Sequence, residues 1–218
     1  GCLSSAPIPC PASAPIQADA IVLAGHAHAT ARLLEPLVPA ASSQMRAIPT
    51  APLAVVCMAW PRTTTGSSLE GFGVLLAREE KRRTLGILFE SNVFPGRCAS
   101  DRAMARAMIG GALDPDAHRL SDEALLDIAR ADLAAATGLS VTPDFFRVFR
   151  HGLGIPQYTV GHLARLTAIE ESLGSLPGLF LVGSSYRGVS INSCIAQACP
   201  TADRVLRFLE DGSSPQNI

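Results

Sequence analysis

Short apolar runs, separated by glycine, proline or charged residues, are spread along the whole chain. Ala18–Ala24 (ADAIVLA) predicts a strand. The apolar residues that follow, from Gly25 to Leu34, have the spacing of a helix, which Pro36 ends. Ala51–Trp60 predicts a buried strand, because the run is apolar but too short to cross a membrane. Strands that alternate with helices indicate a chain of the α/β class, with mixed α+β character where strands follow one another directly.

The middle of the chain predicts an antiparallel sheet. Gly71–Ala77 and Arg83–Glu90 are extended runs, and the charged stretch Arg78–Arg82 between them is typical of a hairpin connection. Ala103–Gly111 fits either a helix or a strand, and its terminal Gly-Gly favours a strand that another group approaches closely. Lys81–Arg83, a run of adjacent basic residues, predicts a solvent-exposed turn.

Two helices are predicted beyond this sheet. Ser121 is a suitable N-cap, and Gly138 a suitable terminator, for a helix whose apolar residues share one face. A strand is predicted at Phe145–Arg150, and the second helix at about Val160–Leu173.

The C-terminal region has the layout of an anion or cofactor site. Leu179–Val182 predicts a strand, a loop with Gly183 and Gly188 follows, and a helix begins near Val189 and runs to about Leu209. The free amides and the dipole of a helix N-terminus attract phosphates and polarised carbonyls. Many α/β domains have such turns without a ligand, so a purely structural turn is the alternative.

Composition excludes several classes of function. The chain has 218 residues, of which 48% are hydrophobic and 17% charged, with a formal net charge of -1. The apolar share is too high for a disordered protein, and the near-zero charge gives no general attraction to nucleic acid. No charged segment precedes an apolar core at the start, which argues against a secretory signal and favours a cytoplasmic protein.

Candidate chemistry from side chains alone is sparse. The 6 cysteines include no CxxC pair and are interpreted as free thiols, with Cys57 and Cys194 in apolar runs that predict burial. His26 and His28 form an HxH pair, but without a nearby third ligand no metal site is predicted. The sequence offers no Ser/His/Asp set and no paired carboxylates, so we nominate no catalytic residue.

A series of motifs resembles protoporphyrinogen oxidases, the haem-biosynthesis members of the flavin amine-oxidase superfamily. The motifs occur in the family's order, and the similarity covers about residues 18–209. The matching strings are GFGVL (71–75), LFESNVFPGR (88–97), MIGG (108–111), IPQYTVGH (155–162) and GLFLVGSSYRGVSINSCIAQA (178–198).

The resemblance implies only part of such a protein. The family opens with a GxGxxG fingerprint that binds the FAD pyrophosphate, and this sequence has no such motif. We therefore expect the C-terminal half of a two-domain flavoprotein, with a missing N-terminal half as its partner. The expected parts are a proline-rich irregular start (1–17), a strand–helix unit of the Rossmann-like FAD domain (18–50), an antiparallel-sheet substrate domain of the amine-oxidase type (51–150) and a C-terminal FAD-domain segment (151–218).

For the cofactor, the resemblance implies FAD and nominates residues in and near the C-terminal motif. A loop that merely packs on the helix is the alternative for the two residues outside that motif. The nominated residues are Gly183 and Ser184 near the pyrophosphate, Gly188 at a close backbone approach, Val189, Ser190, Ile191 and Asn192 at the isoalloxazine ring, and Gln157 and Tyr158 beside the flavin.

The implied reaction is oxidation of a porphyrinogen to a porphyrin, with molecular oxygen as the acceptor. Leu75, Leu88 and Met108 match pocket-lining positions for the flat tetrapyrrole, with plain core packing as the alternative. Arg97 is either a partner for a propionate or a surface arginine. Two other readings stay open: an amine-oxidase-type flavoprotein acting on an amine or carotenoid precursor, and a non-catalytic truncated copy that packs against a partner. The family also implies peripheral membrane contact.

Overall fold

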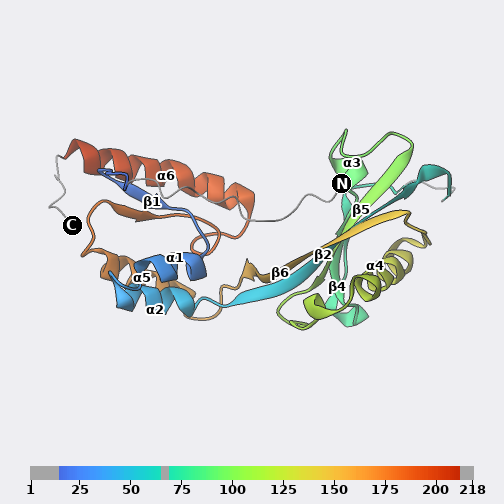
Figure 1. The fold of residues 1–218 in the computed structure, drawn as a ribbon, viewed down its shortest axis with the longest axis horizontal. Helices are drawn as coiled ribbons and strands as arrows, with labels where there is room; N and C mark the ends of the chain where they lie inside the picture. Colours follow the sequence, from blue (N-terminus) through green and yellow to red (C-terminus); the bar gives the residue numbers. More distant parts are fainter. Residues whose placement is uncertain (1–14, 65–68, 212–218) are drawn as a thin grey trace. The chain divides into compact units, whose positions relative to one another are not determined.

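The computed structural model describes residues 15–64 and 69–211. The chain divides into two compact units: unit 1 combines Gly1–Met45 with Leu163–Ile218, and unit 2 is Arg46–His162. Unit 2 is therefore an insertion between the two parts of unit 1, as the colours of Figure 1 show. Of the proline-rich start predicted at 1–17, residues 1–14 lie outside the described part.

Unit 2 is built on an antiparallel sheet with the strand order β3-β4-β5-β2-β6 (Figure 1). The strands are β2 (Thr50–Pro61), β3 (Gly73–Leu75), β4 (Thr84–Leu88), β5 (Arg102–Gly110) and β6 (Phe145–Pro156). The run that fits either a helix or a strand forms β5, whose residues alternate between half-buried and buried positions. The predicted antiparallel sheet is confirmed.

The helix α4 (Asp122–Thr137) covers one face of this sheet. The Ser121 hydroxyl accepts a hydrogen bond from the amide of Ala124 at 3.2 Å, and Gly138 ends the helix in the left-handed conformation with φ 74°. Both predicted helix ends are therefore confirmed. The buried residues of α4 pack with Trp60 of β2, whose side chain is 0% exposed.

The last strand of the sheet is longer than predicted. A strand was expected at Phe145–Arg150, but β6 continues to Pro156 because Ile155 and Pro156 pair with Ala51 and Thr50 at the start of β2. The compact unit accordingly extends to His162, past the boundary expected at residue 150.

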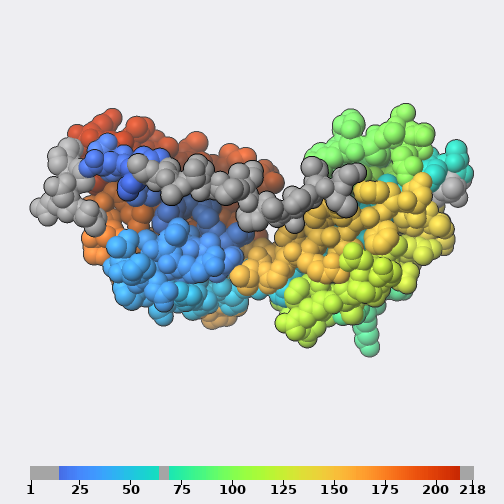
Figure 2. Space-filling model, in the orientation of Figure 1, coloured from blue at the N-terminus to red at the C-terminus, as the bar shows by residue number. Residues whose placement is uncertain are grey.

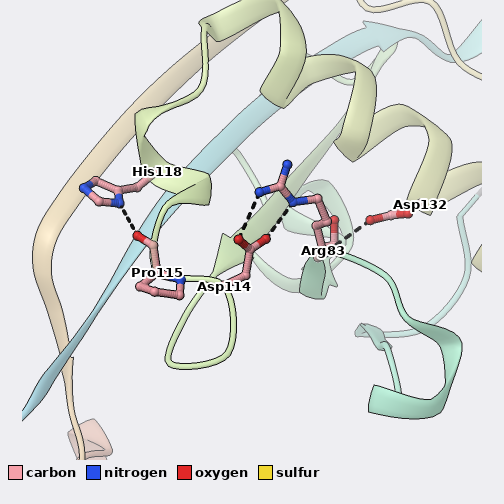
Figure 3. Close-up of polar contacts among 6 residues, drawn as sticks. Arg83, Asp114, Pro115, His118 and Asp132 are labelled. Carbon is pink, nitrogen blue, oxygen red and sulfur yellow. Dashed lines mark hydrogen bonds and ion pairs between the residues drawn. The ribbon is translucent and has the colours of Figure 1, made fainter.

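The predicted solvent-exposed basic turn is confirmed for Lys81 and Arg82, whereas Arg83 is half-buried. Both arginines also form ion pairs that the sequence analysis did not predict. Arg83 donates to both carboxylate oxygens of Asp114 at 2.6 and 2.9 Å, as Figure 3 shows. Arg82 forms an ion pair at 3.3 Å with Asp132 of α4, and Asp132 also accepts the backbone amide of Thr84 at 3.2 Å. These contacts link β4 to α4 and to the loop after β5. Asp114 lies 31 residues after Arg83, and Asp132 lies 50 residues after Arg82. A pattern of charges among neighbouring residues cannot predict pairs so far apart in the sequence.

The Arg83–Asp114 pair predicts an acid-dependent part of the stability. Hydrogen bonding to Arg83 lowers the pKa of the Asp114 carboxyl in the folded state. Its contribution is present above the unfolded pKa of about 3.9 and is lost as pH falls through the lower folded pKa. Below about pH 4 the wild type should therefore lose up to ~1 kcal/mol more than Asp114→Asn, since the pair is partly exposed. Urea titrations across this range test it, and identical pH profiles would contradict it.

Unit 1 holds a two-stranded parallel sheet of β1 (Ile21–Leu23) and β7 (Leu179–Leu181), with Ile21 opposite Leu179. The blue and the orange-to-red segments of this unit lie against each other in Figure 2. Its helices are α1 (Ala27–Leu34), α2 (Pro39–Arg46), α5 (His162–Leu173) and α6 (Ile191–Glu210). Within the described ranges, no helix is both long and apolar enough to cross a bilayer.

The helix α2 has no counterpart in the sequence analysis. It begins at Pro39, where a missing backbone N–H costs nothing because the first turn has no intrahelical acceptor. The Ser42 hydroxyl donates to the carbonyl of Ala31 at 2.8 Å, which joins α2 to α1.

The cysteine predictions are partly confirmed. Cys57, Cys98, Cys194 and Cys199 are free thiols, as expected, and Cys2 and Cys10 lie outside the described residues. The expected burial of Cys57 and Cys194 is wrong, because both are only partly buried. Cys57 lies on the sheet face opposite α4, and Cys194 lies in the exposed first turns of α6.

Candidate functional site

The loop between β7 and α6 adopts a backbone that glycine permits. Gly183 has φ 126° and Gly188 has φ 137°, both in the region that side chains disfavour. A Cβ at Gly188 would overlap the side chain of Ser193, and one at Gly183 would lie 3.2 Å from the carbonyl oxygen of Ala24. The loop therefore approaches the end of β1 and the start of α6 too closely for other residues.

The first turn of α6 is exposed and suited to an electron-rich group. Val189, Ser190, Ile191 and Asn192 are all exposed, and the turn carries no acidic side chain. The Ser190 hydroxyl caps the helix by accepting the amide of Ser193 at 3.0 Å. The helix dipole and the remaining first-turn amides can therefore act on a phosphate or a flavin ring.

Residues that sequence reasoning missed hold this loop in place. The Ser185 hydroxyl, only 2% exposed, accepts the backbone amide of Ala27 at the start of α1 at 3.0 Å. The Gln197 side chain of α6 donates to the carbonyl of Arg187 at 2.6 Å. Burial raises the pKa of Tyr186, so its phenol stays protonated. No local signal marks Ser185, because its partner lies 158 residues away.

The Ser190 cap gives a testable prediction. Ser190→Ala should destabilise the start of α6 by about 1 kcal/mol, because the amide of Ser193 loses its acceptor. Ser172→Ala is the control, since the Ser172 hydroxyl donates to a carbonyl inside α5 and its loss should cost far less. Hydrogen exchange of the α6 amides measures the difference, and equal protection in the two variants would contradict it.

Gln157 and Tyr158 lie in unit 2, whereas the loop after β7 lies in unit 1. The Gln157 amide donates to the carbonyl of Pro49 at 2.8 Å, and its side chain donates to the carbonyl of Ile155 at 3.0 Å. The ring of Tyr158 stacks on His162 with centroids 4.0 Å apart and an interplanar angle of 12°. These contacts shape the segment itself, and its position beside a flavin stays a prediction.

Leu75, Leu88 and Met108 share the sheet face that α4 does not cover, called here the open face. Gly86 of β4 pairs with Leu75 of β3 on one side and with Met108 of β5 on the other. Because paired residues on neighbouring strands point to the same face of a sheet, Leu75 and Met108 lie on one face. Leu88 is opposite Arg106, which lies two residues before Met108 on that same face. Leu75 is 88% exposed, so plain core packing does not explain it.

The side chain of Arg97 has partners in the protein. It forms an ion pair with Glu90 at 3.3 Å and lies 4.7 Å from the centre of the Phe94 ring. Glu90 begins α3 (Glu90–Val93), is 1% exposed, and also pairs with Arg106 at 2.8 Å. Arg97 is therefore not an isolated surface residue, and its contact with a propionate stays a prediction. Among the described residues, no group of three His, Cys, Asp or Glu side chains could hold a metal ion.

Comparison with known proteins decides the family. Residues 8–206 match the family of flavin-containing amine oxidoreductases. The chain belongs to this family. The match covers most of the chain, including both strands of unit 1 and the whole sheet of unit 2, and it makes a flavin the cofactor class.

Relatives of this flavin-containing amine oxidoreductase confirm the resemblance read from the motifs. Protoporphyrinogen oxidase 2 of Arabidopsis thaliana is 31% identical over 75% of this chain and 33% of that protein. Coproporphyrinogen III oxidase of Propionibacterium freudenreichii is 31% identical over 88% of this chain and 36% of that protein. The chain thus spans about a third of the length of these relatives.

Solved structures show the same fold. A protein from Exiguobacterium sp. assigned as a protoporphyrinogen oxidase superposes with a TM-score of 0.70 at 26% identity, covering 88% of this chain and 42% of the other. A reduced UDP-galactopyranose mutase has a TM-score of 0.65 at 12% identity over 88% of this chain and 43% of that one, which speaks for the fold alone. The mixed α/β architecture expected from the sequence is therefore confirmed for this amine oxidoreductase.

Proposed function

We propose that the chain is part of an FAD-dependent porphyrinogen oxidase of haem biosynthesis, with molecular oxygen as the electron acceptor. The proposal rests on one combination of features. The chain has both a glycine loop before α6 and an apolar open face, and its relatives are named porphyrinogen oxidases.

The residues of unit 1 fit the cofactor. The Cβ position of Gly188 is taken up by the Ser193 side chain, so the loop packs directly on α6, and the first turn of α6 is exposed to a ligand. Gly183 and Ser184 would hold the pyrophosphate, and Val189–Asn192 would hold the ring. When bound there, FAD would supply the acceptor for hydride equivalents and would pass the electrons to oxygen.

The residues of unit 2 orient the substrate. An apolar face with Leu75, Leu88 and Met108 can hold a flat tetrapyrrole and keep water from its reacting carbons. Gln157 and Tyr158 would lie against the flavin and limit access to it. Because the chain has no GxGxxG segment, we propose that an N-terminal half completes the FAD site.

The test combines two measurements on the chain, alone and together with an N-terminal half that carries GxGxxG. Flavin fluorescence reports FAD retention, and porphyrin fluorescence reports oxidation of protoporphyrinogen and coproporphyrinogen against autoxidation. Retention of FAD with a rate above autoxidation supports the proposal. Bleaching of the flavin by an amine would instead favour an amine substrate, and failure of both assays in the complete assembly would leave a non-catalytic protein.

A further inference from the structure

Two arginines share the open face with its apolar residues. The register of the sheet places them in one row across the strands, with Cys57 of the central strand between them. A neighbouring row is apolar. The first row is Leu88, Arg106, Cys57 and Arg147, and the neighbouring row is Leu75, Gly86, Met108, Val55 and Phe149.

Glu90 holds the first of these arginines in place. Its carboxylate is 1% exposed, and it pairs with Arg106 at 2.8 Å and Arg97 at 3.3 Å. One buried negative charge thus faces two positive charges, so the cluster keeps a net positive charge. Burial raises the pKa of the Cys57 thiol, so this group adds no negative charge between the arginines.

The second arginine has no such partner. Arg147 of β6 is exposed, and no described residue forms a hydrogen bond or an ion pair with its guanidinium. Neighbouring strands lie about 4.8 Å apart, so Arg106 and Arg147 start about 10 Å from each other on one face. Their side chains are long enough to bind one anionic group together or two that project from one ligand.

We infer that Arg147, together with the Glu90-held Arg106, binds the carboxylates of the tetrapyrrole whose ring lies on the apolar row. The inference rests on the proposed function and names the residues that recognise the carboxylates of its substrate. A guanidinium binds a carboxylate through two parallel hydrogen bonds, and the apolar row accepts the ring. Charge complementarity thus selects a tetrapyrrole with carboxylate side chains as the ligand. The strand β6 supplies a contact for these carboxylates that the sequence motifs did not indicate.

Binding of a stable porphyrin tests the inference without any catalysis. The full chain is titrated with coproporphyrin III and with its tetramethyl ester, and binding is followed by porphyrin fluorescence. We expect the free acid to bind more tightly than the ester, and this preference to shrink at high salt. Arg147→Gln should weaken binding of the free acid about tenfold and leave the ester unchanged, because only the acid has charges to lose.

Two further variants separate charge from folding. Arg147→Lys keeps the charge but loses the paired hydrogen bonds, so it should restore part of the affinity. Arg119→Gln removes one charge from an exposed position with 75% side-chain exposure and should behave as the wild type. Equal binding of acid and ester, or equal affinity of Arg147→Gln and Arg119→Gln, would overturn the inference. Acid-selective binding by this chain, with no porphyrinogen oxidation by the complete assembly, would count against the proposed function but not against this site.

Discussion

Replacing Trp60 by alanine should lower the free energy of unfolding of unit 2 by about 4 kcal/mol, within the range of buried Trp truncations. Trp60 is 0% exposed and packs in the core between the sheet and α4. The loss combines the transfer of a large apolar side chain with the cavity left behind. Since domains are stable by only about 5–15 kcal/mol, this loss should move the unfolding transition to a much lower urea concentration. The chain has 1 tryptophan, so far-UV circular dichroism in urea is the suitable measurement.

Trp60→Phe is the matched control. The indole nitrogen of Trp60 finds no hydrogen-bond partner among the described residues, so its removal breaks no bond of the protein. The phenylalanine variant should therefore lose only about 1–2 kcal/mol, for the smaller volume. If both variants lost the same stability, packing volume would not be the cause.

Gly188→Ala should disrupt the start of α6 and weaken flavin binding more than tenfold. The added Cβ would overlap the side chain of Ser193, and alanine disfavours the observed φ of 137°. Strain and overlap together cost about 3 kcal/mol unless the first turn moves, and movement of that turn displaces the amides proposed to face the flavin. Equilibrium binding of FAD to the assembly measures the loss.

Gly138→Ala separates the two causes. Gly138 also has a positive φ, of 74°, but a Cβ there meets nothing within 4 Å. This variant should lose about 1 kcal/mol of stability at the end of α4 and no flavin affinity. A Gly188→Ala variant that retains full flavin affinity would contradict the proposed role of the loop.

The parts of the fold that depend on neighbouring residues could be predicted from the sequence. Ser121 and Gly138 carry their helix-ending chemistry within one turn, so both ends of α4 were predicted correctly. The hairpin at 78–82 likewise depends on local charge and chain direction. The Arg83–Asp114 pair, by contrast, joins residues 31 apart, and no local pattern distinguishes a paired arginine from a solvated one.

The candidate site also has some parts that depend on neighbouring residues and others that depend on strand pairing. A strand, a glycine loop and a helix start are local features, and the structure places Gly183, Gly188 and Ser190 where that pattern puts them. The open face depends instead on strand register, which aligns Arg106 with Cys57 and Cys57 with Arg147 only after the sheet has formed. For this reason, the sequence motifs did not indicate Arg147 as a candidate site residue.

The insertion of unit 2 into unit 1 constrains the order of folding. The parallel pair β1–β7 and the Ala27–Ser185 hydrogen bond join residues 158 apart, so unit 1 cannot form until the chain has been synthesised past Ser185. The described strands of unit 2 pair with one another in antiparallel fashion, and Thr50 pairs with Pro156 near the two ends of the unit. Once folded, unit 2 brings the flanking segments of unit 1 together and removes most of the entropic cost of closing so long a loop. A nascent chain should therefore form the open face of unit 2 before the glycine loop of unit 1.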